Sequence, residues 1–224
     1  MGARAAGLAG IRALFPLAMA VFPFGVVYGV LVARSDFPNA VGALASPVIY
    51  AGAAQIALVD LLDRDTPIAI AVGTALIINL RMMMYSAALA PAIARFGRGW
   101  RVAVPYAITD QLTVVSLLWF EKNPDPRDRR AFFVSGGLFF LAVWVLGTLI
   151  GIATGAQVPD GLQLGFAIPL TFLALLMPTL RGRPELTAAL ASGLVVVLVP
   201  GLPYSLGVPV GAVVGVLAGM AAQR

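Results

Sequence analysis

Long apolar stretches alternate with short polar segments along the whole chain of 224 residues. Their lengths suit transmembrane helices, which need about 20 apolar residues to cross the hydrocarbon core. Helices fit best here, since a backbone amide in lipid must be satisfied within its own segment. The pattern predicts an all-α polytopic transmembrane bundle of seven or eight spans, some broken by proline or glycine, within one domain over residues 1–224. The expected spans cover residues 13–33, 40–62, 67–93, 102–120, 131–154, 161–180, 186–199 and 206–222.

The last two stretches, 186–199 and 206–222, are short and are separated by PGLPYS. They form either two short helices or one broken hairpin. Within the second, Gly211, Gly215 and Gly219 repeat every four residues, a spacing that lets helices approach closely. We expect these glycines to form a packing face, and a second protein is one candidate to occupy it.

Composition supports a membrane protein and excludes several kinds of chemistry. Hydrophobic residues make up 60% of the chain and charged residues 11%, whereas soluble domains carry about a quarter charged residues. Cysteine and histidine are absent, which excludes thiolate or imidazole metal sites and cysteine or histidine catalysis. Lys122, the one lysine, follows no glycine-rich phosphate loop. We expect no enzyme activity, no catalytic residue, no cofactor and no resident metal.

The positive charge lies in loops beside the spans, where lysine and arginine set membrane topology, so it indicates no nucleic-acid partner. An eight-span topology with the N-terminus inside gives an excess of basic residues on the inner side. The inner residues are then Arg4, Arg12, Arg64, Lys122, Arg127, Arg129, Arg130, Arg181, Arg183 and Arg224, and the outer ones are Arg34, Arg95, Arg98 and Arg101. Three of the exceptions share the loop 95–101. Either that loop has a special role or an early segment is re-entrant.

Two ionisable residues lie well inside the expected spans. Arg81 is at the centre of 67–93, and Asp110 is near the middle of 102–120. A charge at the bilayer centre costs roughly 3 kcal/mol on insertion scales, so such residues pair with each other and are often functional. Because the two are opposite in sign and similar in depth, we expect an ion pair. The pair either lies on a transport path or only holds two helices together.

Further polar residues lie at comparable depth and are candidates to orient the pair. Gln55 lies in YAGAAQIAL, and Asn79, Tyr85 and Ser86 flank Arg81 in NLRMMMYS. Arg81 and Tyr85 are four residues apart and share a helix face. Gln111 directly follows Asp110. An isolated asparagine or glutamine in a membrane helix usually joins helices, but several beside one charge pair favour a binding site.

Pro23 and Gly25 lie in the middle of the first expected span. A proline inside a helix removes a hydrogen bond and frees a carbonyl group. Irregular backbone in a membrane is tolerated where it lines a cavity, and broken helices mark the binding sites of transporters. We therefore expect a break at this position that contributes to the site; the alternative is a helix that is only kinked.

Four segments together resemble the AzlC-type branched-chain amino-acid permeases of bacteria: PFGVVYG, YAGAAQIALVDLL, INLRMMMYSAALAPAI and AITDQ. The resemblance covers nearly the whole chain in span order. It implies a secondary transporter in the inner membrane that exports branched-chain and similar apolar amino acids. It also implies a small AzlD-type membrane subunit as partner. Family members often carry a glutamate after the aspartate of the fourth span, where this chain has Gln111.

The residues suit an amino-acid substrate. A guanidinium such as that of Arg81 can bind a carboxylate, and Asp110 can bind an ammonium group and respond to protons. Methionines 82–84 with Phe22 and Phe24 can supply an apolar pocket. Three alternatives remain: a membrane assembly subunit whose charge pair is structural, a channel, and an intramembrane enzyme that would depend on Asp110 alone.

Overall fold

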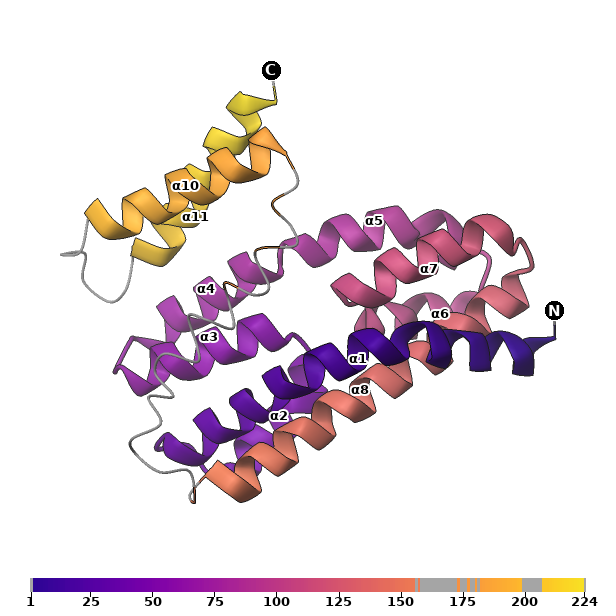
Figure 1. The fold of residues 1–224 in the computed structure, drawn as a ribbon, viewed down its shortest axis with the longest axis horizontal. Helices are drawn as coiled ribbons and strands as arrows, with labels where there is room; N and C mark the ends of the chain where they lie inside the picture. The colour runs from indigo at the N-terminus through magenta and orange to yellow at the C-terminus, as the bar shows by residue number, and fades with distance from the viewer. Residues whose placement is uncertain are drawn as a thin grey trace. The chain divides into compact units, whose positions relative to one another are not determined.

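The computed structural model describes residues 2–155, 157, 173, 177, 180, 182–198 and 207–223. These residues form helices and no strand, as the sequence predicts (Figure 1). The expected span 161–180 lies outside the described residues except at three positions. The helices are α1 (Ala3–Arg34), α2 (Asn39–Ile49), α3 (Gly52–Asp63), α4 (Ile68–Asn79), α5 (Arg81–Ile93), α6 (Arg98–Ala103), the 3-10 helix η1 (Val104–Ala107), α7 (Asp110–Lys122), α8 (Pro126–Gly155), α10 (Arg183–Leu198) and α11 (Gly207–Ala222).

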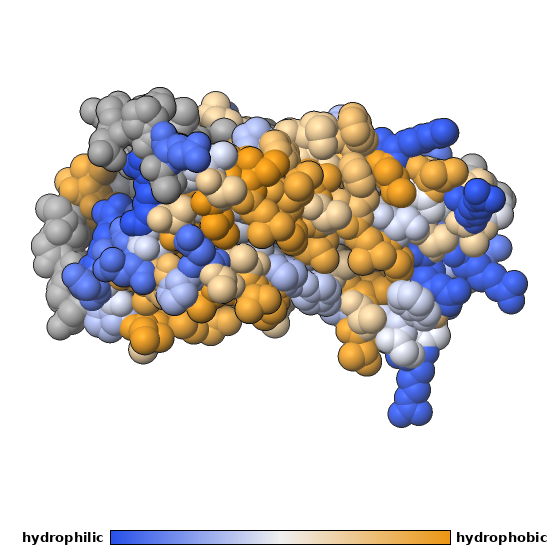
Figure 2. Space-filling view, turned by 90° about the horizontal axis from the view of Figure 1, so that it is seen from below, coloured by the Kyte–Doolittle hydropathy of each residue, from blue (hydrophilic) through white to orange (hydrophobic). Residues whose placement is uncertain are grey.

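Three described helices are long and apolar enough to cross a membrane: Ala3–Arg34, Ile68–Ile93 and Pro126–Gly155. The second combines α4 and α5, because Leu80 between them keeps a helical backbone conformation. Figure 2 shows apolar side chains over the middle of the visible face and hydrophilic ones toward its two ends. Phe15, Leu138 and Leu146 are among the exposed apolar residues of α1 and α8. Such a distribution suits a surface in contact with lipid.

The chain divides into two compact units. The first comprises Met1–Gln55 and Asn79–Val158, and the second comprises Ile56–Ile78 and Pro159–Arg224. Every candidate site residue that the sequence indicates belongs to the first unit.

The core of the first unit is the contact between α1 and α8, which run side by side in the same direction (Figure 1). Gly10 faces the backbone of Phe132, whereas Gly29, near the C-terminal end of α1, faces Thr148 and Gly151. A Cβ atom at Gly29 would lie within 2.9 Å of the Gly151 Cα atom. Only glycine allows backbones to approach so closely. The small-residue spacing in these two helices is therefore the basis of the core.

Gly25 belongs to this contact, and α1 is a continuous helix through Pro16 and Pro23. The expected break of the first span is therefore wrong. A Cβ atom at Gly25 would lie 2.9 Å from the Trp144 carbonyl oxygen, so this glycine serves helix packing. Pro23 is exposed on the opposite surface of a helix that α8 supports along its length.

The expected span 40–62 is broken instead. After α2, Tyr50 adopts a left-handed conformation (φ 44°, ψ 44°), and a new helix begins at Gly52. The helix α2 starts beside the end of α1, where Gly42 accepts a hydrogen bond from the Tyr28 hydroxyl. It then follows α8 from Thr148 toward Gly137, whose carbonyl accepts from Tyr50 at 3.5 Å. The break thus lies near the middle of α8.

The expected span 102–120 is also not a single crossing but a hairpin. Its first arm, α6 with η1, runs from Trp100, which stacks under Arg130, to Ala107, whose side chain lies beside Gly137. Its second arm, α7, returns along α8, so that Trp119 stacks on Phe132 with ring centroids 4.3 Å apart. The first arm therefore begins, and the second arm ends, beside the first turns of α8. The segment is therefore re-entrant, the second of the two alternatives that the charge pattern left open.

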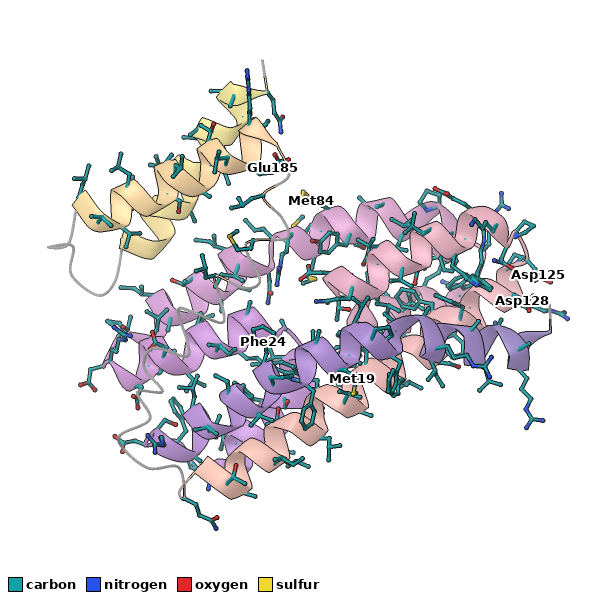
Figure 3. All side chains as sticks on the ribbon, viewed as in Figure 1. Met19, Phe24, Met84, Asp125, Asp128 and Glu185 are labelled. Atoms are coloured by element: carbon teal, nitrogen blue, oxygen red, sulfur yellow. The ribbon has the colours of Figure 1, made fainter. Side chains whose placement is uncertain are left out.

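This hairpin corrects the placement of Arg95, Arg98 and Arg101. Their loop lies at the same end of the first unit as the segment 122–130, because Arg130 donates to the Phe96 carbonyl at 3.4 Å. That end also holds the N-terminus of α1, and Figure 3 shows Asp125 and Asp128 there. We call it the basic end. Its lysine and arginine residues are Arg4, Arg12, Arg95, Arg98, Arg101, Lys122, Arg127, Arg129 and Arg130.

In the second unit, α10 and α11 pack against each other in opposite directions. Gly211 faces Ser192, and Gly219 faces Pro184 and Ala188. Residues 186–222 therefore contain two helices that form an antiparallel pair, with 199–206 outside the described residues. The expected glycine face exists, and α10 occupies it.

Candidate functional site

Arg81 and Asp110 form the expected ion pair. The Arg81 Nη1 atom lies 2.9 Å from the Asp110 Oδ2 atom, and each side chain is about one-third exposed, 34% and 31%. Arg81 is at the centre of the apolar segment Ile68–Ile93. Asp110 lies close to the middle of α8, because Leu112, half a turn further along α7, packs on Gly137. The pair thus lies between α5 and α7 at the depth that the sequence indicates.

Asp110 is the first residue of a helix rather than the middle of one. Thr109 caps α7 by accepting a hydrogen bond from the Leu112 amide at 3.3 Å. The positive end of a helix dipole stabilises a carboxylate in the first turn. The break before α7 therefore places an anion at mid-membrane with two sources of stabilisation, the helix end and the Arg81 guanidinium.

The pair leaves hydrogen-bonding atoms unused. Among the described residues, the buried atoms Arg81 Nε, Asp110 Oδ1 and Asn79 Oδ1 have no hydrogen-bond partner. An unsatisfied buried polar group costs about 1–3 kcal/mol, and more when it is charged. Arg81 and Asp110 thus offer one donor with positive charge and one acceptor with negative charge. The pair can therefore bind a small group that carries both signs of charge.

Tyr85 lies beside the same pair. Its hydroxyl interacts with the Asp110 carboxylate, and its ring lies one turn beyond Arg81 on α5. The structure therefore brings Arg81, Asp110 and Tyr85 together in one cluster. Asn79 is the last residue of α4, two positions before Arg81, and residues two apart do not share a helix face. Ser86 and Gln111 are half-buried on α5 and α7, next in sequence to two members of the cluster.

Gln55 lies at the break after α2, near the depth of the ion pair, but its hydrogen-bond partners are backbone groups rather than the pair. It is 1% exposed and bonds to the backbone around the break after α2. Its Oε1 atom accepts from the Ala51 amide at 3.3 Å, and its Nε2 atom donates to the Ala45 carbonyl at 3.1 Å. Gln55 thus supplies hydrogen bonds that the interrupted helix lacks. Its side chain stabilises the backbone at the break.

The expected apolar pocket is not enclosed by the methionines. Met83 and Met84 are 69% and 65% exposed, and Figure 3 shows Met84 on the outer side of α5. Phe24 lies on α1 and is half-buried (Figure 3).

Tyr50 and Ser116, which the sequence pattern did not indicate, stand out in the structure, together with Thr113, a polar residue that accompanies Asp110 in the sequence. Tyr50 carries the left-handed backbone at the break, and its ring is tilted by 34° against the Tyr106 ring, with ring centroids 6.0 Å apart. Thr113 and Ser116 are buried on α7, and their hydroxyl oxygens have no partner among the described residues. The spacing of Asp110, Thr113 and Ser116, three residues apart each time, was a signal available in the sequence.

Comparison with known proteins agrees with the membrane architecture. The family model described as "AzlC protein" matches residues 16–158. An uncharacterized membrane protein of Archaeoglobus fulgidus is 31% identical over 81% of this chain and 78% of its own length. Inner membrane protein YgaZ of Escherichia coli K12 is 23% identical over 88% of this chain and 83% of its own length. An uncharacterized membrane protein of Helicobacter pylori is 26% identical over 73% of this chain and 72% of its own length.

No solved structure gives a significant match. The matched segment 16–158 contains α1 from residue 16 onward, the whole of α8, both helix breaks and the Arg81–Asp110 pair. Since the family model covers more than half of the chain and relatives match across most of their length, the chain is a membrane protein of the AzlC family.

Proposed function

We propose that this protein is a secondary transporter that exports branched-chain or similar apolar amino acids across the inner membrane of a bacterium. The observation that carries the proposal is the set of unused atoms around the Arg81–Asp110 pair. An amino acid supplies what they lack. Its carboxylate accepts from Arg81, and its ammonium group donates to Asp110.

A structural pair is the competing function for these residues. A purely structural pair in lipid is most stable when every donor and acceptor is satisfied. The unused Arg81 Nε and Asp110 Oδ1 atoms therefore favour a site that receives a ligand. The two helix breaks near the same depth support this, since discontinuous helices provide polar backbone groups at the binding sites of transporters.

Transport in the proposed function is coupled to protons, and the N-terminus is cytoplasmic. Asp110 is the carboxylate in the cluster and can exchange a proton during the cycle. The basic end carries nine lysine and arginine residues, whereas Arg34 is the basic residue at the opposite end of the first unit. Cytoplasmic loops carry an excess of lysine and arginine, which supports an inward basic end.

The proposed assembly includes a small AzlD-type membrane subunit. Its support is the family membership of this chain rather than a contact in the structure. Copurification of this chain with a candidate subunit from the same membrane, followed by reconstitution of each alone and both together, tests the assembly. Activity of this chain alone at the full rate would remove the need for a partner.

Counterflow in proteoliposomes tests the transport function. Vesicles loaded with unlabelled leucine should accumulate labelled leucine from outside without any pH gradient. Labelled aspartate should not accumulate in them. A channel does not concentrate label in this way, and an assembly subunit does not move it at all. Absence of counterflow, both with and without the partner subunit, would refute the proposal.

A further inference from the structure

Thr113 and Ser116 lie on the buried face of α7, at 1% and 0% exposure. The Oγ atoms of both have no hydrogen-bond partner among the residues that the structure describes. A hydroxyl group without a partner in the interior costs about 1–3 kcal/mol. Two such groups on one short helix therefore require an explanation.

Three other helical threonines donate their hydroxyl group within their own helix. Thr148, Thr154 and Thr187 each donate to the carbonyl four residues earlier, at 3.1, 2.8 and 2.8 Å. That bond is the usual solution for a hydroxyl in a membrane helix. Thr113 does not use it, although its own amide bonds to the Thr109 carbonyl at 3.0 Å. The two α7 hydroxyls remain open to another partner.

The hydroxyls continue the ion-pair site along α7. Residues three apart lie on one helix face, so Asp110, Thr113 and Ser116 form a polar stripe. The stripe begins at the unused Asp110 Oδ1 atom and leads toward the basic end. Neighbours in the stripe are about 5–6 Å apart at their Cβ atoms, a distance that one water molecule can bridge between side-chain oxygens.

Few charged or titratable groups can compete for a proton beside this stripe. Arg81 and Tyr85 on α5 face Asp110. The charged residues of α8 lie in its first two turns, and those of α1 are exposed. Tyr28 of α1 donates its hydroxyl to Gly42, and Tyr106 of η1 contacts Tyr50.

An aromatic cluster lies where the stripe meets the basic end. Phe120, one turn beyond Ser116, contacts Phe96 and Phe132 edge to face, with centroids 6.3 and 6.5 Å apart. Arg129 lies over the Phe120 ring and donates to the Phe120 carbonyl. The stripe is therefore closed toward the basic end in this structure, and movement of the cluster would open it.

We propose that Thr113 and Ser116 are a proton relay between Asp110 and the basic end of the protein. The inference rests on the proposed transport function and adds the route of its coupling ion. When protonated Asp110 releases its proton, the Oδ1–H bond breaks and the carboxylate pairs again with Arg81. Each relay oxygen, with water between them, accepts one proton and passes one on. The proton ends on water at the basic end, and the hydroxyl groups are unchanged.

The test compares two transport assays on the same proteoliposomes, prepared with the subunit composition that gives wild-type counterflow. Leucine counterflow at equal pH needs substrate binding but no net proton movement. Leucine transport driven by a pH gradient needs the relay as well. The variants are Thr113→Val, which keeps the side-chain shape, Ser116→Ala, and Thr113→Ser, which keeps the hydroxyl. Thr154→Val on the exposed face of α8 is the matched control.

Thr113→Val and Ser116→Ala should lower gradient-driven transport by about tenfold or more, as expected when a proton-transfer group is lost, and leave counterflow within about twofold. Thr113→Ser and Thr154→Val should behave like the wild type in both assays. Removal of an unsatisfied hydroxyl should also leave the melting temperature unchanged or higher.

Four results would overturn the relay. Gradient-driven transport at the wild-type rate in Thr113→Val and Ser116→Ala would show that protons do not pass these hydroxyls. Loss of counterflow at unchanged protein abundance would assign the hydroxyls to substrate binding instead. If the wild-type protein shows counterflow but no response to a pH gradient, proton coupling and the relay are excluded while the transport proposal stands. If the wild-type protein shows no counterflow, both proposals are refuted.

Discussion

Tyr50 and Tyr106 place their rings 6.0 Å apart and join two interrupted segments of the chain. Tyr50 marks the break after α2, and Tyr106 lies in η1 directly before α7. The first segment starts at the end of the unit that holds Arg34, and the second starts at the basic end. Two breaks that enter from opposite ends therefore meet near the middle of α8. This arrangement is what places Asp110 at the start of a helix within the membrane.

Removal of either charge of the pair should abolish transport. Truncation of one partner of a charged, hydrogen-bonded contact weakens binding by about 2–5 kcal/mol, so Arg81→Ala and Asp110→Asn should show no leucine counterflow above background. The exchange variant with Arg81→Asp and Asp110→Arg should insert normally and also fail to transport. Labelled leucine in proteoliposomes, at matched protein abundance, checks the outcome. Wild-type flux in the exchange variant would mean that the pair is only structural.

The chain contains no cysteine, so single cysteines report topology without prior substitutions. Gly99→Cys and Asp125→Cys should react with a membrane-impermeant maleimide from the same side, because both loops lie at the basic end. Asp36→Cys should react from the other side. Labelling in intact cells and in inverted vesicles distinguishes the sides. Opposite sides for Gly99 and Asp125 would restore the eight-crossing topology and contradict the hairpin of α6, η1 and α7.

A side chain at Gly29 should separate α1 from α8. Gly29→Leu would force atoms into the Thr148 carbonyl and the Gly151 backbone. Overpacking of this kind costs about 1–3 kcal/mol, which lowers the melting temperature of a chain of this length by roughly 2–12 °C. Gly193→Ala in α10, where no atom lies within 4 Å of the added group, should leave the melting temperature unchanged or higher. Equal melting temperatures for Gly29→Leu and wild type would contradict the close packing.

Gln55→Leu should destabilise the protein rather than alter its substrate preference. The change leaves the Ala51 amide and the Ala45 carbonyl without their side-chain partner, at about 1–3 kcal/mol each. Gln111→Leu applies the same substitution to a half-buried residue of α7, which is not part of the break after α2, and it should affect stability far less. Thermal unfolding in detergent compares the two variants. A stable Gln55→Leu protein with changed amino-acid selectivity would return this residue to the substrate site.

The ion pair was predictable because few charges lie inside the spans. Two ionisable residues of opposite sign at similar depth lower their burial cost by pairing with each other, and the structure contains this ion pair. The small-residue spacing of α1 and α8 likewise indicated close packing, but not which helices would meet. That information depends on tertiary contacts between residues far apart in sequence.

The helix breaks were harder to predict because local signals for them were ambiguous. Pro23 suggested a break, yet α1 continues through it, supported by its long contact with α8. The actual break at Tyr50 carries neither proline nor glycine at the left-handed position. Its stability comes from Gln55, a contact that propensity does not encode. The three arginines of the loop 95–101 did indicate the hairpin. A full crossing at 102–120 puts them on the outer side, against the excess of basic residues expected inside.

The parallel contact between α1 and α8 has a consequence for how the protein is made. Gly29 and Gly151 are 122 positions apart (151 − 29), so α1 leaves the ribosome long before its partner is synthesised. At about 5–20 residues per second, that interval lasts roughly 6–24 s. During this time the glycine-lined surface of α1 faces lipid or an insertion factor. The first helix therefore has to remain in the membrane without its partner during this interval, and slowing elongation between the two helices should lengthen its exposure to membrane proteases.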